Sequence, residues 1–124
     1  HIVLRGSMQT SNYSPLDIQK AQILLKERGL SPRLLVDAAH GNSHKIADNQ
    51  KNVCYNVLDQ HLGGNRGIMG LMIESYLEEG TQPITAEVNP RKSVTDPCIN
   101  WRETEDLILS MHESLLHSSA ACTV

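Results

Sequence analysis

Three short apolar runs alternate with segments of helical periodicity, and this alternation limits the fold more than any other feature. The runs His1–Arg5, Leu34–Ala38 and Gly67–Glu74 predict strands, and the last of them is almost continuously apolar. A run of that kind is typical of a parallel strand covered on both faces. The order of strand and helix therefore predicts an α/β fold with a parallel sheet.

Periodicity and end signals predict three helices between and after these runs. The first has Ser14 as its N-cap and Gly29 after its last turn. The second carries an apolar stripe interrupted only by Gln50 and His61, and the third begins near Asn100. The apolar members of the second stripe are Ile46, Val53, Cys54, Val57, Leu58 and Leu62. The inner stripe of the third helix is predicted to be Trp101, Thr104, Leu107, Ile108, Met111 and Leu115.

The segment from Ser75 to about Ile99 contains Gly80 and several prolines, so we expect little regular structure through most of it. Loops of this length in compact domains are usually functional or disordered. The last residues, 117–124, are small and polar and are predicted to fray.

Charge and cysteine content narrow the class of protein. The net charge is −3 and the pI is about 6.0, which gives no support for a nucleic-acid or anionic-membrane binder but is compatible with small anionic substrates. The cysteines Cys54, Cys98 and Cys122 are odd in number and form no CxxC pair, which favours a reduced, cytoplasmic protein. No apolar stretch approaches the roughly 20 residues of a membrane span, and no signal peptide is recognisable. The chain enters an apolar run directly at His1, which suggests that a preceding part is absent.

Polar side chains follow the predicted strands at an interval of about 34 residues. Arg5, His40 and Glu74 each lie at or just past a strand end, and Asp96 lies in the long loop before Pro97. In parallel α/β folds, catalytic residues gather at the carboxyl ends of the strands. An imidazole with two carboxylates suits Mn²⁺, Fe²⁺, Co²⁺ or Zn²⁺, and a nearby arginine suits phosphate or carboxylate.

Each of these residues also has a purely structural interpretation. His40 is compatible with a hydrogen-bonded structural histidine, and Glu74 with a salt bridge that compensates its burial. Asp96 is compatible with a turn or a helix cap. Arg5 is compatible with an ion pair to Asp37 or Glu74. Spacing alone leaves these alternatives open.

Several short motifs of the sequence, taken together, resemble those of one protein family. HIVLRG, NYSP, DAAHGNSHK, GLMIESYLEEGTQ and SVTDPCINW, in this order, resemble the bacterial and fungal 3-deoxy-D-arabino-heptulosonate 7-phosphate synthases. The resemblance covers residue 1 to about residue 116. It implies a (β/α)8 TIM barrel in which residues 1–116 form the last three strand–helix units of one domain, with the N-terminal part absent and residues 117–124 as a tail.

The resemblance also implies a reaction and roles for the four polar residues. The family condenses phosphoenolpyruvate with D-erythrose 4-phosphate, the first step of the shikimate pathway, and releases phosphate. His40, Glu74 and Asp96 match three ligands of a divalent metal, and Arg5 matches an arginine that binds phosphoenolpyruvate. His40 and Asp96 are also expected to contact substrate and to take part in catalysis. The fourth ligand of the family is a cysteine that no cysteine here matches, so this chain alone is expected to be inactive.

The sequence also leads to expectations about regulation, assembly and alternative activities. The resemblance implies a homo-oligomer and feedback inhibition by an aromatic amino acid. The motifs GNRGIMGLMIES and SVTD favour tyrosine as the inhibitor. The sequence departs from the family at Ser7, where a second glycine is frequent, and at Pro97, where alanine is usual. Two other functions stay open, a related eight-carbon sugar-acid synthase and a non-catalytic half-barrel used for assembly or regulation.

Overall fold

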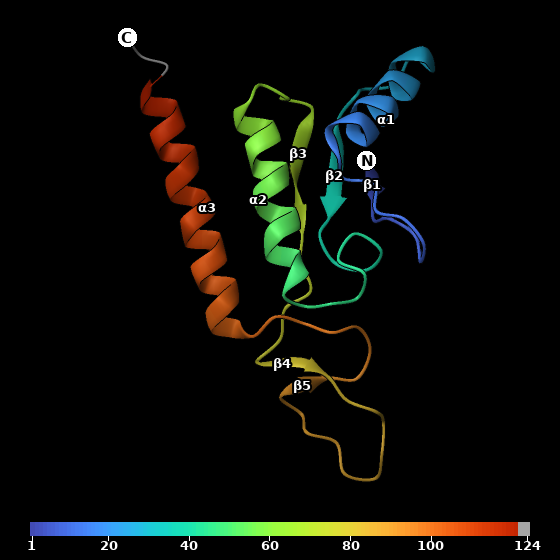
Figure 1. The fold of residues 1–124 in the computed structure, drawn as a ribbon, viewed down its shortest axis with the longest axis vertical. Coiled ribbons are helices and arrows are strands. Elements are labelled where there is room, and N and C mark those ends of the chain that lie inside the picture. Colours follow the sequence, from blue (N-terminus) through green and yellow to red (C-terminus); the bar gives the residue numbers. More distant parts are fainter. Residues whose placement is uncertain (122–124) are drawn as a thin grey trace. The chain divides into compact units, whose positions relative to one another are not determined.

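A computed structural model describes residues 1–121 (Figure 1), and the chain divides between Glu74 and Ser75 into two compact units, each described by itself below. The first unit holds three strands and two helices, and the second holds two short strands and one helix. The elements of the first unit are β1 (Ile2–Leu4), α1 (Pro15–Glu27), β2 (Leu34–Asp37), α2 (Asn49–Leu62) and β3 (Ile68–Met72). Those of the second are β4 (Glu78–Thr81), β5 (Lys92–Ser93) and α3 (Trp101–Ala121).

The first unit is built on a parallel sheet with the strand order β1-β2-β3, which confirms the predicted α/β class. Leu34 and Val36 on the central strand are fully buried. In the register, Leu4 lies opposite Val36, and Val36 lies opposite Leu71. The carboxyl ends of all three strands therefore meet at one edge of the sheet. Each strand is shorter than its apolar run predicted, so Glu74 lies two residues beyond the end of β3.

Helix α1 follows the predicted end signals closely. The Ser14 hydroxyl accepts a hydrogen bond from the Asp17 N–H at 3.2 Å and donates one to the Asp17 carboxylate at 2.6 Å. This satisfies one of the free N–H groups of the first turn. Gly29 adopts a φ of 66° just after the last turn, a conformation that glycine takes without strain. Ile18 and Leu25 form its buried side.

Helix α2 begins at Asn49, so the predicted stripe is wrong at Ile46, which is 55% exposed. The reason lies in the backbone just before the helix. His44 and Lys45 have φ values of 53° and 57°, in the left-handed region, which a right-handed helix excludes. The remaining stripe packs beside β3 (Figure 1). Its buried members are Gln50, Val53, Cys54, Val57 and Leu58.

The second unit contains regular structure that its glycines and prolines did not predict. β4 and β5 pair in parallel across the loop that joins them. The side chain of Gln82 closes this loop, because its amide nitrogen donates to the carbonyl oxygens of Asn89 at 2.7 Å and Lys92 at 2.8 Å. Side-chain hydrogen bonds of this kind leave no periodic signal in a sequence.

Helix α3 begins after Asn100, as expected, with reciprocal hydrogen bonds between Asn100 and Glu103. Its predicted inner stripe is wrong at three positions. Apolar side chains lie on more than one face of this helix, so apolar character alone does not identify the buried face. The exposed members are Trp101, Ile108 and Leu115. The helix continues to Ala121, past the predicted boundary at residue 116, and Cys122 lies outside the described residues. Among the described residues, no helix is both long and apolar enough for a membrane span.

Candidate metal centre

The turn that follows β2 places His40 with a defined orientation. Asp37, which is only 4% exposed, accepts a hydrogen bond from the Ala39 N–H at 2.9 Å through one carboxylate oxygen. Its other oxygen lies 2.9 Å from Nδ1 of His40. An ionised carboxylate only accepts hydrogen bonds, so the proton of the neutral His40 ring belongs on Nδ1. The lone pair of Nε2 is then directed away from Asp37.

The backbone of His40 is in an uncommon conformation. Its φ is 50°, in the left-handed region that β-carbon sterics disfavour for residues other than glycine. The Lys45 N–H donates to the His40 carbonyl at 2.9 Å, and the Ser43 hydroxyl approaches the same oxygen at 3.3 Å. Residues held in such conformations by their surroundings cluster at functional sites.

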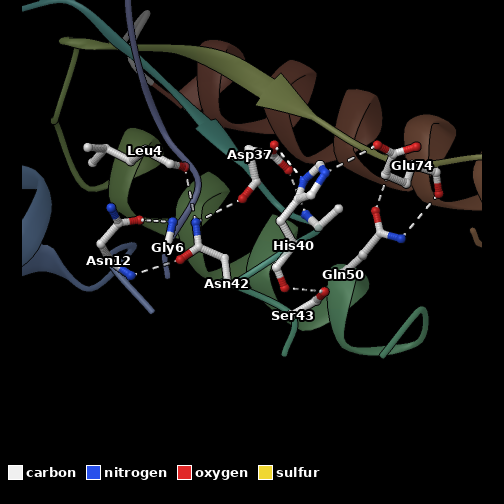
Figure 2. A network of polar contacts seen from close by, with 10 residues as sticks. Leu4, Gly6, Asn12, Asp37, His40, Asn42, Ser43, Gln50 and Glu74 are labelled. Atoms are coloured by element: carbon white, nitrogen blue, oxygen red, sulfur yellow. Dashed lines mark hydrogen bonds and ion pairs between the residues drawn. The ribbon is translucent and has the colours of Figure 1, made fainter. Parts of the chain in front are cut away.

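Glu74 lies beside His40 at the same edge of the sheet. Its Oε1 is 3.7 Å from Nε2 of His40, and its side chain is 38% exposed. Figure 2 shows Asp37 and Glu74 on opposite sides of the His40 ring. The backbone of Glu74 is held by Gln50 of α2, whose amide makes two hydrogen bonds to it. An imidazole nitrogen and a carboxylate oxygen thus face each other at the ends of two parallel strands.

Asn42 joins the end of β1 to the end of β2. Its amide nitrogen donates to the carbonyl oxygens of Leu4 at 3.1 Å and Asp37 at 2.8 Å. Its amide oxygen accepts from the Asn12 N–H at 2.8 Å, and the Asn12 side chain accepts from the Gly6 N–H at 2.8 Å (Figure 2). These bonds fix the chain on both sides of Arg5.

The same junction requires glycine at two places. A β-carbon on Gly41 would collide with the backbone nitrogen and oxygen of Ser7. Gly6 has a φ of 70°, and a β-carbon there would lie 2.7 Å from the Asn42 nitrogen. Ser7, the departure from the family pattern, contributes its hydroxyl to the adjoining turn and accepts from the Thr10 N–H at 3.0 Å.

Arg5 follows β1 directly and is exposed. Within residues 1–121 it forms no ion pair with Asp37 or Glu74, so the structural alternative for this residue is wrong. Asp37 is instead engaged by His40 and the Ala39 N–H. The role of Arg5 in binding an anion stays a prediction.

Asp96 belongs to the second unit, where it lies between β5 and α3. The chain on both sides of it is fixed within that unit. The Thr81 hydroxyl donates to the Thr95 carbonyl at 2.9 Å, and Gly80 and Cys98 exchange backbone hydrogen bonds of 2.8 and 3.2 Å. The alternative in which Asp96 caps α3 is wrong, because the capping side chain is Asn100. The place of Asp96 in a ligand set stays a prediction.

Cys54 fits the interpretation as a core residue. It is fully buried on α2, and burial raises the pKa of its thiol to about 12. The thiol is therefore protonated at neutral pH, which argues against a nucleophile or a thiolate ligand at this position.

Three supporting residues were missed by reasoning from the sequence alone: Asp37, Asn42 and Gln50. All three are buried and polar. A signal existed for Gln50, which interrupts an otherwise apolar stripe, and for Asp37, which closes an apolar strand. A polar residue at a position that periodicity assigns to the interior must have a hydrogen-bond partner there.

Comparison with known proteins identifies the family. Residues 1–109 match the family described as the DAHP synthetase I family. The phospho-2-dehydro-3-deoxyheptonate aldolase, Tyr-sensitive, of Enterobacter agglomerans is 41% identical over 118 residues, which are 93% of this chain and 55% of that protein. The Tyr-sensitive protein of Escherichia coli K12 is 42% identical over 93% of this chain and 33% of its own length. The Phe-sensitive protein of the same organism is 37% identical over 110 residues.

A solved structure gives the same result. The phospho-2-dehydro-3-deoxyheptonate aldolase of Francisella tularensis SCHU S4 superposes with a TM-score of 0.85 at 30% identity, over 91% of this chain and 33% of that one. The chain thus spans between a third and about half of the length of these relatives. With the motifs, the parallel sheet and the family match in agreement, this chain belongs to the DAHP synthetase I family.

Proposed function

We propose that this chain supplies part of the active site of an enzyme that condenses phosphoenolpyruvate with D-erythrose 4-phosphate. The products are 3-deoxy-D-arabino-heptulosonate 7-phosphate and phosphate, in the first step of the shikimate pathway. The observation that carries the proposal is the His40 and Glu74 pair at the ends of two parallel strands, in a chain of this family. We further propose that residues 1–116 form the last three units of a (β/α)8 barrel.

The His40 and Glu74 pair fits a divalent metal of the group Mn²⁺, Fe²⁺, Co²⁺ and Zn²⁺. Two ligand atoms at about 2.1 Å from one ion lie roughly 3 to 3.5 Å apart, and the separation here is 3.7 Å. A movement of a few tenths of an ångström would let both atoms bind one ion. With its proton on Nδ1 toward Asp37, the His40 ring presents the lone pair of Nε2 toward Glu74, which is the arrangement of a metal-binding histidine. We propose Asp96 as a third ligand from the second unit.

Arg5 is proposed to hold phosphoenolpyruvate. Its guanidinium offers paired N–H donors to a carboxylate or phosphate, and a bidentate pair fixes orientation as well as position. This would place the attacking carbon against the aldehyde of the sugar phosphate and lower the entropic part of the barrier. When bound, a divalent ion supplies Lewis acidity to that aldehyde. His40 and Asp96 are proposed to contact the substrates beside it.

Feedback inhibition by an aromatic amino acid is part of the proposal. The relatives include proteins named as Tyr-, Trp- and Phe-sensitive. The Tyr-sensitive relatives named above are 41 and 42% identical to this chain, whereas a Trp-sensitive relative is 36% and a Phe-sensitive one 37% identical. We therefore favour tyrosine. A homo-oligomer and a cytoplasmic location stay predictions of the sequence.

The test of the reaction is a chimera with the Escherichia coli Tyr-sensitive relative. Its matching segment is replaced by residues 1–116 of this chain, and consumption of phosphoenolpyruvate is followed with erythrose 4-phosphate and, separately, with arabinose 5-phosphate. We expect turnover with erythrose 4-phosphate and its loss, by at least about 100-fold, in the Arg5→Ala chimera. The 124-residue chain alone is expected to be inactive.

Two results would contradict this proposal. A folded chimera that uses only arabinose 5-phosphate would assign the chain to the eight-carbon alternative. A folded chimera that is inactive with both sugar phosphates, while the unmodified relative is active in the same assay, would favour a non-catalytic role.

A further inference from the structure

The amide of Gln50 holds the backbone of Glu74 at two points. Its nitrogen donates to the Glu74 carbonyl at 3.1 Å, and its oxygen accepts from the Glu74 N–H at 2.8 Å (Figure 2). Gln50 lies in the first turn of α2 and is completely buried. Glu74 lies two residues beyond β3, past Met72, the last residue of β3 in the register with β2. The glutamine takes the place of a strand partner at this position.

The same helix is connected to the turn that carries His40. The Asn49 side chain donates to the Ser43 carbonyl at 3.0 Å, and the Gln50 N–H donates to the Ala47 carbonyl at 3.1 Å. The first turn of α2 therefore contacts both ligand-bearing segments, the turn after β2 and the segment after β3. A shift of Gln50 would change the position of Glu74 relative to His40.

From this arrangement we propose that Gln50 is a positioning residue that fixes the Glu74 carboxylate against the His40 imidazole and thereby sets the affinity for a divalent ion. The inference rests on the proposed metal site. Residues that orient metal ligands typically change affinity 10- to 100-fold when they are replaced. A glutamine that served only to stabilise α2 would change the free energy of unfolding and leave the affinity of the folded protein unaltered.

Gln60 provides a matched control on the same helix. Its amide nitrogen also donates to a backbone carbonyl outside the helix, that of Tyr13, at 2.8 Å. It makes a second hydrogen bond to Asn56 and none to the turn of His40 or to Glu74. The substitutions Gln50→Met and Gln60→Met therefore remove the same chemical group from α2, and only the first touches the ligand segment.

The experiment is a titration of the 124-residue chain and its variants with Mn²⁺, followed by electron paramagnetic resonance, with thermal unfolding of each variant measured in parallel. We expect Gln50→Met to weaken binding by roughly 10- to 100-fold and Gln60→Met to leave it within about twofold. Equal affinities for Gln50→Met and the wild type, with Glu74→Gln impaired, would overturn the positioning role while the metal site stood. Unchanged binding by Glu74→Gln would overturn the metal site itself and the inference with it.

A second variant and a second measurement apply if Gln50→Met does not fold. Gln50→Asn keeps the amide but places it one methylene short of the Glu74 backbone, so an intermediate loss of affinity is expected, and wild-type affinity would overturn the inference. In the wild type, the Glu74 amide is expected to be protected from hydrogen exchange. Exchange as fast as in an exposed loop would contradict the two hydrogen bonds on which the role depends.

Discussion

The two units of the molecule use polar side chains in different ways. In the first, Asn42 is 2% exposed and makes three hydrogen bonds that join β1, β2 and the loop before α1. In the second, Gln82 also makes three, but Gln82 is only half-buried, and its partners are the exposed Asn89 and the half-buried Lys92 of β5. Removal of the Asn42 side chain leaves buried polar groups without a hydrogen bond, whereas water can replace the side chain of Gln82 as a hydrogen-bond partner. Burial, more than the number of bonds, should therefore decide how strongly each unit depends on its polar residues.

The largest effect on stability is expected for Asn42→Ala. The substitution leaves the Leu4 and Asp37 carbonyls and the Asn12 N–H without their partner, at a cost of about 2 to 4 kcal/mol in the free energy of unfolding. Urea unfolding of the chain measures this. Asn56→Ala, at an exposed position on α2, is the control and should change stability by no more than about 0.5 kcal/mol. Equal effects of the two substitutions would contradict the role given to burial.

Gln82→Ala tests in the second unit how much a half-buried side chain with three hydrogen bonds contributes to stability. It removes three hydrogen bonds, as Asn42→Ala does, but we expect a cost below about 1 kcal/mol because solvent reaches the groups it exposes. The same unfolding experiment gives the value. A loss as large as that of Asn42→Ala would show that the loop between β4 and β5 is part of a cooperative core.

Asp37→Asn tests whether the first unit fixes the chemistry of His40 as well as its position. Asparagine can keep the acceptor for the Ala39 N–H, but its amide nitrogen then faces Nδ1 of His40 and requires an acceptor there. The ring proton should move to Nε2, and Mn²⁺ affinity should fall roughly 10-fold or more. Nitrogen-15 NMR of the metal-free chain reports the tautomer, and Asp59→Asn on the exposed side of α2 is the control. An unchanged tautomer would contradict this account.

The smallest effect is expected at Glu78, whose side chain is 42% exposed. A hydrogen bond from Arg91, with a second from Asn89, holds the pKa of Glu78 below its ordinary value. The contribution of this residue to stability is therefore present above the ordinary glutamate pKa of about 4.3 and is lost as the pH falls through the lower native value. Amide shifts of the β4–β5 loop during an acid titration should show this change and lose it in Glu78→Gln. Identical titrations of the two proteins would contradict the assignment.

The two units also differ in how far the sequence predicted them. The strands of the first were placed to within one or two residues because a strand covered on both faces is an apolar run. Since parallel strands end at one edge, His40 and Glu74 could be expected to lie together. The bonds of Gln50 to Glu74 and of Asn42 to Asn12 span 24 and 30 residues, and no periodicity reveals such pairs.

Local backbone conformation accounts for the other differences. The left-handed His44 and Lys45 delay the start of α2, and neither is glycine, the residue that adopts this conformation most readily. In the second unit, little regular structure was expected through most of the segment from Ser75 to Ile99, and its two short strands β4 and β5 are joined by a loop that the Gln82 side chain bridges. Prediction succeeded where burial of apolar groups determines the structure and failed where single side chains do.

The central claim is that His40 and Glu74 share one divalent ion, and Mn²⁺ binding to the chain tests it most directly. We expect one Mn²⁺ per chain, with His40→Ala and Glu74→Gln each weakening binding by more than about tenfold. His61→Ala is the control, because that ring lies at the far end of α2 beside the Ile68 carbonyl and Arg66. Wild-type affinity in both the His40 and Glu74 variants would contradict the account.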